Sequence, residues 1–341
     1  MNLAVATPRR ARKPNSQGSK PMTSAQSNRR WRTPCRAGAT ILEMAVVLGL
    51  VLVLLAMVIL LLPGFGRTRD GARHIKDASQ VRVILQGMQM AAANNQNLIP
   101  YPSTLHSGPP SEPDTPAALL RRLLADGLFS SEWLVSPAEA NSAIRVFERD
   151  EAGKHNSPSR GPIEMFTATP SDIPGRTFGH CSYAFTPPFG SRRAWLKTDG
   201  SATQAVVGNR GPSFEGGRTE PWTLFGEAQE RATGRKGITS KTLLIHGGRR
   251  TWEGNVAYAD GHVNFESQAD PPQLLWTFSG LPSEKQTRPD NLFVNENDQT
   301  GAADDEQLRG NAAANANNFL RLWSSASFDG AAAAGITPWY D

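Results

Sequence analysis

The sequence predicts an α+β protein in which a long N-terminal helix, first membrane-spanning and then amphipathic, packs on a small antiparallel β-sheet with loop insertions. Three observations predict this fold: an unbroken apolar run, a helical apolar stripe after it, and β-type segments joined by an Asp-Gly turn. The expected boundaries are a basic leader at 1–38, a spanning helix at 39–62, an amphipathic helix at 67–97, a helix-and-loop insertion at 98–177, and a β-sheet region with an acidic loop and tail at 178–341.

The apolar run extends from Ile41 to Leu62, and Glu43 is its only charged residue. Its 22 residues would form a helix roughly 33 Å long, which spans a hydrocarbon core of about 30 Å. A carboxylate inside such a helix costs on the order of a few kcal/mol, so it normally has a partner or a function. A side chain that snorkels to the membrane edge is the alternative for Glu43.

The segment before this run is strongly basic. Residues 1–38 contain nine Lys and Arg residues and no acidic residue, so the chain's net charge of +5 becomes −4 without them. By the positive-inside rule this leader stays in the cytoplasm and the chain after Leu62 is translocated. The basicity therefore belongs to the leader and does not predict a nucleic-acid partner. Cys35 also lies in the leader, which leaves Cys181 without an internal disulfide partner.

The basic leader is followed by Gly38, Ala39, Thr-Ile-Leu-Glu43 and an apolar helix. This order resembles the cleavage and methylation signature of type IV prepilins and type II secretion pseudopilins. The resemblance implies that a prepilin peptidase cuts between Gly38 and Ala39 and methylates the new N-terminus. Ala39 stands where that family usually has Phe. Glu43 matches the family's glutamate at the fifth mature position. The resemblance implies that it pairs with the N-terminal amine of a neighbouring subunit, in a low local dielectric.

A second helical pattern follows a predicted kink or short break at Pro63–Gly66 and runs from about 67 to 97. Its apolar residues recur at steps of three and four and predict one buried face: Ile75, Ala78, Val81, Leu85, Met88 and Ala92. A short amphipathic helix is predicted within Ala117–Trp133, with Gly127 near its end. Residues 137–176 are polar and rich in Gly and Pro, and are expected to form a surface insertion.

The β region begins near Phe178. Four segments are predicted as strands: Cys181–Phe185, Thr242–His246, Asn255–Ala259 and His262–Glu266. Asp260-Gly261 predicts a type I′ hairpin turn between the last two. The block NVAYADGHVNFE, with His246 upstream, resembles the H-x9-DG motif of a prepilin-associated group, although thirteen residues separate His246 from Asp260. The resemblance implies a pilin-like arrangement of spine helix and sheet.

Four residues have side chains that zinc can use: His246, Glu253, Asp260 and His262. Because the histidines lack a short metal-ligand spacing and the turn needs Asp260, structural roles are the expectation. His246-Gly-Gly-Arg249 is similar to an esterase oxyanion loop, but the chain contains no G-x-S-x-G and no G-x-x-x-x-G-K-[ST] segment. The sequence therefore predicts no catalytic residues and no enzyme.

The C-terminal region concentrates oxygen-bearing side chains of the kind calcium prefers. They are Asp290, Asn295, Glu296, Asn297, Asp298, Asp304, Asp305 and Glu306. The spacing does not match an EF-hand, and a solvated acidic loop is the default expectation. Major pseudopilins bind calcium in a C-terminal loop, so the resemblance adds a possible calcium cofactor. The Ala/Asn-rich run 311–318 and the last eleven residues are expected to be a surface helix or a loosely held tail.

These patterns predict a structural subunit of a pseudopilus or pilus-like filament, anchored in the inner membrane with its C-terminal domain outside the cytoplasm. The expected partners are the prepilin peptidase, other pilins or pseudopilins, and the inner-membrane assembly platform, with no nucleic acid. The alternative is a monomeric, membrane-anchored binding protein whose exposed face includes Trp195, Trp222 and Trp252.

Overall fold

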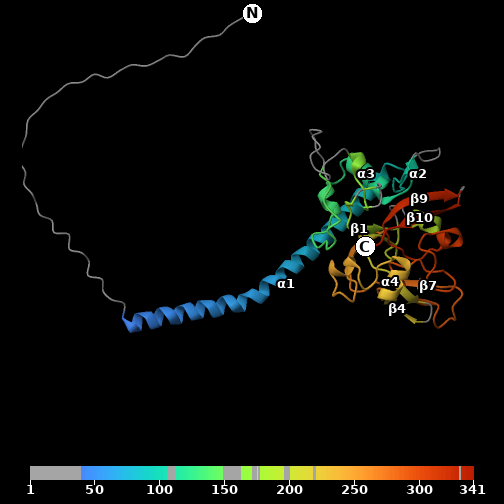
Figure 1. The fold of residues 1–341 in the computed structure, drawn as a ribbon. Helices are drawn as coiled ribbons and strands as arrows, with labels where there is room; N and C mark the ends of the chain where they lie inside the picture. Colours follow the sequence, from blue (N-terminus) through green and yellow to red (C-terminus); the bar gives the residue numbers. More distant parts are fainter. Residues whose placement is uncertain are drawn as a thin grey trace, which may run out of the picture. The chain divides into compact units, whose positions relative to one another are not determined.

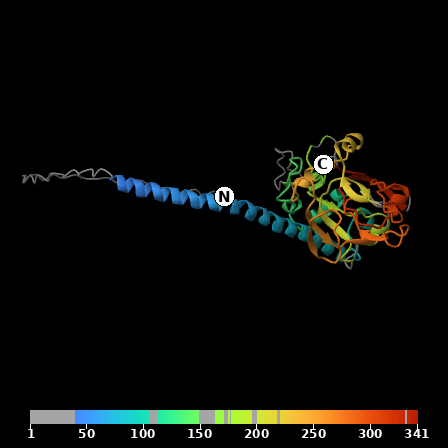
Figure 2. The same cartoon turned by 90° about the horizontal axis from the view of Figure 1, so that it is seen from below.

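The computed structural model describes residues 40–105, 112–148, 163–170, 175, 177–195, 200–217, 220–329 and 332–341, and for residues 60–70, 165, 327–329 and 332–334 it describes the backbone alone. The chain divides into two compact units, Met1–Leu61 and Leu62–Asp341. The described residues combine helices with antiparallel sheets (Figures 1 and 2), which confirms the predicted α+β class.

The elements follow one another in a mixed order along the chain. The α-helices are α1 (Ile41–Ala93), α2 (Pro102–Leu105), α3 (Pro116–Ala125) and α4 (Glu227–Thr233). The short 3₁₀ helices are η1 (Ser131–Leu134), η2 (Ile163–Met165), η3 (Gly190–Trp195), η4 (Lys241–Leu244) and η5 (Gly310–Ala314). The strands are β1 (Tyr183–Phe185), β2 (Ala205–Asn209), β3 (Phe214–Gly217), β4 (Glu220–Leu224), β5 (Gly254–Tyr258), β6 (Val263–Glu266), β7 (Leu275–Thr277), β8 (Thr287–Pro289), β9 (Trp323–Asp329) and β10 (Ala332–Pro338).

The first helix, α1, is 53 residues long. It begins after Thr40, whose side-chain oxygen accepts a hydrogen bond of 3.2 Å from the Glu43 N–H, as in a helix N-cap. After its end at Ala93, Gln96 and Asn97 have left-handed backbone angles, with φ of 54° and 61°. Of the kink or short break predicted at residues 63–66, the break is wrong, because helical backbone continues through them. A proline removes one helical hydrogen bond, and the turns on either side can carry a helix across it.

One face of the amphipathic part of α1 is buried. Its buried side chains include Asp77, Gln80, Val81, Ile84, Leu85, Met88 and Ala92. This spacing of three and four residues is that of a single helical face. The predicted stripe is confirmed from Val81 to Ala92 but is wrong at Ile75, which is 72 % exposed. The face continues toward the N-terminus through Gln80 and Asp77 instead, because polar side chains from other elements bond to them there.

The central sheet has the strand order β1-β2-β5-β6, and each neighbouring pair is antiparallel. The two middle strands, β2 and β5, are buried along their whole length. Val81 of α1 shares a hydrophobic core with Val207 of β2 and Ala257 of β5. The next residues along β5, Val256 and Tyr258, belong to a second core, as the alternation of a strand requires. The amphipathic helix therefore packs on one side of a small antiparallel sheet.

The hairpin between β5 and β6 forms where the sequence predicts it, but its turn differs. Tyr258 O accepts a hydrogen bond from Gly261 N (2.9 Å), and Tyr258 N donates to His262 O (3.0 Å). Of the turn residues, Gly261 has a positive φ, 98°, and Asp260 does not. The predicted type I′ turn is therefore wrong. The loop has three residues, in which a turn is followed by a glycine in a positive-φ conformation.

The segment Thr242–His246 is not a strand as predicted. Residues 241–244 form the 3₁₀ helix η4, and Ser240 caps its start by accepting a hydrogen bond from Thr242 N at 3.3 Å. Thr242, Leu243 and Ile245 are buried and Leu244 is half exposed. A short apolar run of this kind fits a helical turn and a strand equally well, so local capping decides the outcome.

The insertion and the tail are more deeply embedded than expected. Phe147 and Phe166, from the predicted surface insertion, are buried in the first core. At the other end of the chain, β9 and β10 form an antiparallel hairpin, and Trp323 is fully buried in the same core. The predicted loosely held tail is therefore wrong. The predicted short helix is present as α3, capped by Thr115, and Gly127 follows it with φ of 70°.

Candidate functional site

The N-terminal part of α1 is apolar and uncovered. The segment Ile41–Ile59 is long and apolar enough to cross a membrane, and none of its residues is buried by the described chain. Its large apolar side chains are between 50 and 91 % exposed. An apolar surface of this extent is stable only against lipid or against other protein surfaces.

Glu43 lies exposed in the first turn of this helix. A carboxylate there is stabilised by the helix macrodipole, and Thr40 and Glu43 have the T-x-x-E spacing of a capping box. Glu43 therefore has the first-turn position and the spacing of a capping-box residue, beside the assembly role that the resemblance implies. The other predicted processing residues, Gly38 and Ala39, lie outside the described residues.

The most connected buried group on α1 is Asp77, which is fully buried. The Tyr183 hydroxyl of β1 donates to its Oδ1 (2.9 Å), and the Asn255 side-chain amide of β5 donates to its Oδ2 (2.7 Å). His246 Nε2 lies 3.1 Å from the same Oδ2. One carboxylate therefore joins the helix to two strands of the central sheet and to the loop after η4.

These contacts change the acidity of Asp77. Burial raises the pKa of its carboxyl, but the hydrogen bonds and charge of His246, with hydrogen bonds from Ser136 and Asn255, outweigh burial and hold the pKa below its ordinary value. Asp77 was not among the site residues predicted from the sequence. Its signal was available: Asp77 stands one helical turn before Val81, on the apolar face, where an unpaired charge would be very unfavourable.

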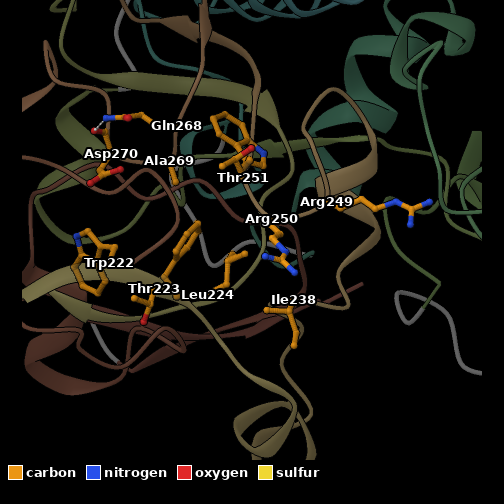
Figure 3. Close-up of a pocket in the computed structure, with 12 residues that line it drawn as sticks. Trp222, Thr223, Leu224, Ile238, Arg249, Arg250, Thr251, Gln268, Ala269 and Asp270 are labelled. Carbon is orange, nitrogen blue, oxygen red and sulfur yellow. Dashed lines mark hydrogen bonds between the residues drawn. The ribbon is translucent and has the colours of Figure 1, made fainter.

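Of the tryptophans that the alternative function places on an exposed face, two are internal. Trp195 is 7 % exposed and Trp252 is 2 % exposed, so neither contributes to such a face. Trp222 on β4 is half-buried, and together with Trp252 it lines a cavity of about 730 Å³ (Figure 3). The cavity lies among β3, β4 and the segments 249–252 and 268–270.

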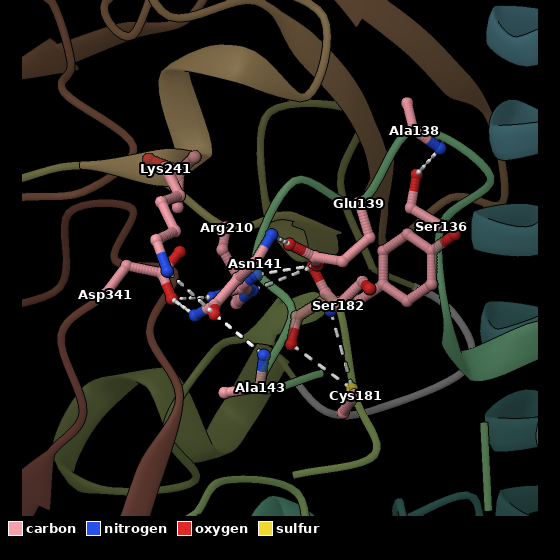
Figure 4. Close-up of polar contacts among 12 residues, drawn as sticks. Ser136, Ala138, Glu139, Asn141, Ala143, Cys181, Ser182, Arg210, Lys241 and Asp341 are labelled. Carbon is pink, nitrogen blue, oxygen red and sulfur yellow. Dashed lines mark hydrogen bonds and ion pairs between the residues drawn. The ribbon is translucent and has the colours of Figure 1, made fainter. Parts of the chain in front are cut away.

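A buried ion-pair cluster holds the last described residue, as Figure 4 shows. Arg210, next to the end of β2, contacts Glu139 and Asp341 at 2.6 Å each, and all three side chains are at most 5 % exposed. Asn141 donates to Asp341 (2.6 Å) and accepts from Lys241 (3.3 Å). Burial lowers the pKa of Arg210, but the two carboxylates outweigh it and raise that pKa above its ordinary value. The cluster links segments far apart in the sequence, so its role is structural.

The acidic loop is not a solvated segment. Asp290 is fully buried and accepts hydrogen bonds from the side chain of Asn317 (3.0 Å) and from the backbone (2.7 Å) and side chain (2.8 Å) of Asn318. Asp298 accepts from Ala316 N, and Asp304 accepts from the Asn315 side chain. The acidic loop and the Asn-rich run, both predicted to be on the surface, therefore satisfy each other's polar groups.

The predicted calcium ligands have protein partners in this network. Asn295 accepts from Arg192 (2.7 Å), Asn297 accepts from Thr300 N (3.0 Å), and Asp305 accepts from Gln307 N (2.9 Å). Among the described residues no group of three or more His, Cys, Asp or Glu side chains could hold a metal ion. The calcium site stays a prediction, which these contacts do not favour.

Burial has a strong effect on the acids at the centre of this network. It raises the pKa of Asp290 to about 6, against the opposing hydrogen bonds from Asn317 and Asn318. Burial and the charge of Asp290 together raise the pKa of Glu296 well above its ordinary value, although Arg288 contacts it at 2.7 Å. Such shifts are typical of buried acids that are held by hydrogen bonds.

The candidate zinc residues have different partners. His246 is paired with Asp77, at 1 % side-chain exposure, whereas His262 lies 2.6 Å from Asp260 at the exposed hairpin turn. In the described part of the chain they do not form a metal-binding group. Asp260 also accepts a hydrogen bond from His262 N (3.1 Å), so it has the turn role that the sequence predicts.

No protein-family model, curated protein or solved structure matches this chain. In its described residues the chain is a mixed helix and antiparallel-sheet protein, with an apolar helix near its N-terminus that is long enough to cross a membrane.

Proposed function

We propose that this chain is a pilin-like structural subunit that is anchored in the inner membrane and polymerises through the N-terminal part of α1. One observation carries the proposal: the uncovered apolar segment Ile41–Ile59 belongs to the same helix as the face buried in the first core of unit Leu62–Asp341. A pilin subunit needs these two properties, because its helix must be stable in lipid before assembly and among other helices afterwards.

The apolar side chains of this segment must be kept out of water, and this supports polymerisation. Each large apolar side chain moved out of water contributes about 1.5–3 kcal/mol. Lipid supplies this environment to a single subunit, and the helices of neighbouring subunits supply it in a filament core. In this proposal a prepilin peptidase cuts between Gly38 and Ala39, and Glu43 pairs with the N-terminal amine of the next subunit. The inner-membrane assembly platform then extends the filament, as in a type II secretion pseudopilus or a type IV pilus.

A second candidate function is a monomeric, membrane-anchored binding protein. The cavity beside Trp222 favours it, because a cavity of about 730 Å³ lies within the range of small-ligand sites, about 300–1,000 Å³. Contacts between the apolar helices of separate copies distinguish the two functions, since a monomer makes none.

Cysteine cross-linking in membranes tests the proposal. In a Cys35→Ser background, Val51→Cys places a thiol at a position that is 50 % exposed on the apolar segment. The proposal predicts that oxidation with copper phenanthroline converts this variant into covalent dimers, because Cys181 is buried and the one accessible thiol forms one disulfide with a neighbouring subunit. Ser267→Cys, at an exposed position after β6, is the control for random collisions. A Val51→Cys chain that stays monomeric, or links no more than the control, would leave the monomeric binding protein as the better account.

A further inference from the structure

The cavity beside β4 has a composition that none of the structural roles above explains. It is lined by apolar side chains that include Phe214, Leu224 and Ile238, by the indole of Trp222, and by polar side chains that include Arg250, Gln268 and Asp270. Figure 3 shows Trp222, Gln268 and Asp270 at one end and Arg250 with Ile238 at the other, while the Arg249 side chain points away.

The backbone of β3 makes room for the Trp222 ring. Gly216 and Gly217 have φ of 103° and 77°, and the pairing of β3 with β4 shifts register beside them. A Cβ at Gly217 would lie 2.3 Å from two ring atoms of Trp222. Any other residue would displace the indole and would be strained at this φ. The position of the aromatic surface is therefore set by the strand itself.

The charged groups of the cavity are available to a ligand. Burial raises the pKa of Asp270, and only its own backbone N–H opposes this effect. Among the hydrogen bonds and ion pairs of the described residues, none engages the carboxylate of Asp270 or the guanidinium of Arg250 with another side chain. Gln268 uses its amide nitrogen to donate to the Asp270 backbone oxygen (2.7 Å), which leaves its side-chain oxygen as an acceptor.

The combination restricts the chemistry of the ligand. A polyanion would be repelled by Asp270, and a polycation would be repelled by Arg250. A neutral ring with an apolar face and several hydroxyl groups fits the groups at both ends of the cavity. Its face stacks on the indole, and its hydroxyls donate to the carboxylate and accept from the guanidinium.

We propose that this cavity binds one or more hexose units of a neutral glycan, with Trp222 as the stacking surface and Asp270 and Arg250 as hydrogen-bonding groups. The site does not depend on whether the chain polymerises.

Binding by the full-length chain in lipid nanodiscs, prepared without sugar-based detergent, tests this assignment. The probes are cellohexaose, chitohexaose and maltohexaose, and titration is followed by calorimetry at up to millimolar concentration. At least one hexasaccharide is expected to bind. Trp222→Ala and Asp270→Asn are each expected to weaken that binding by about tenfold or more, as the loss of a stacked ring or of a charged acceptor would. Trp276→Ala, which removes a half-buried tryptophan outside the cavity lining, should leave it unchanged.

Unchanged unfolding midpoints for the variants show that their folds are intact. The assignment is overturned if none of the three hexasaccharides binds, or if binding survives Trp222→Ala in a folded protein. Saturable binding of hexalysine that is lost in Asp270→Asn would assign the cavity to a cationic peptide instead, and would also overturn it.

Discussion

Replacing Asp77 with alanine is expected to destabilise the folded unit by about 3–5 kcal/mol, the effect of breaking a buried charged network by removing one partner. The substitution leaves the Tyr183 hydroxyl, the Asn255 amide and His246 without their common acceptor. Each buried group that loses its partner costs about 1–3 kcal/mol, and these costs are not additive. Since the three partners come from different parts of the fold, the contact between helix and sheet weakens as a whole.

Denaturant unfolding of the full-length protein, followed by tryptophan fluorescence, measures this loss. Lys76→Ala, at the preceding, exposed position of α1, is the matched control and should change stability by no more than about 0.5 kcal/mol.

The contribution of Asp77 to stability also depends on pH. The pKa of Asp77 is held below its ordinary value, so its contribution is fully present above an unfolded pKa of about 3.9 and is lost as the pH falls through the lower folded value. Equal stability of wild type and Asp77→Ala at neutral pH would show that the carboxylate does not hold helix and sheet together.

Glu43→Ala is expected to abolish filament assembly while leaving membrane insertion, cleavage and folding intact. The proposed function gives Glu43 a charge pair with the amine of a neighbouring subunit, formed where few other charges are available. The structure offers a local alternative, because Glu43 stands in the capping-box position three residues after Thr40. Alanine removes both roles and cannot distinguish them.

Glu43→Gln separates them, because glutamine keeps the capping-box chemistry but carries no charge. The pairing role predicts that both variants fail to assemble, as measured by the amount of sedimentable filament in sheared or lysed cells. Leu42→Ala, a neighbouring exposed position, is the control for a smaller side chain in the same turn. Filaments formed normally by Glu43→Gln but not by Glu43→Ala would assign Glu43 to the helix start and contradict the charge pair.

The parts of the fold that the sequence predicted are those encoded by local periodicity. The spacing of Val81, Leu85, Met88 and Ala92 identified the buried face of α1, and the Asp260-Gly261 pair identified the β5–β6 hairpin. The same reasoning failed at Thr242–His246, because a short apolar run fits a strand and a 3₁₀ turn equally well. It also failed in the details of the hairpin, where one positive-φ glycine is sufficient for a three-residue loop.

The buried polar contacts could not be predicted from local patterns, because they join residues far apart in the sequence. Asp77 and Asn255 are separated by 178 residues, and Asp290 and Asn318 by 28. Viewed separately, an acidic loop and an Asn-rich run both indicate exposed, solvated chain. Each satisfies the hydrogen-bonding groups of the other, so together they can be buried. The cavity beside Trp222 has the same origin, since Asp270 and Arg250 come from segments with no motif of their own.

The mass and the N-terminal residue of the protein recovered from membranes test whether the chain is processed and anchored as a pilin-like subunit. We expect a mature chain that begins at Ala39, with or without a methyl group on its amine. Recovery of the intact leader, or of a chain cut beyond Leu62, would contradict it. Glu43 would then be a charge tolerated at a helix start in an anchor or signal, and the monomeric binding protein would become the leading account.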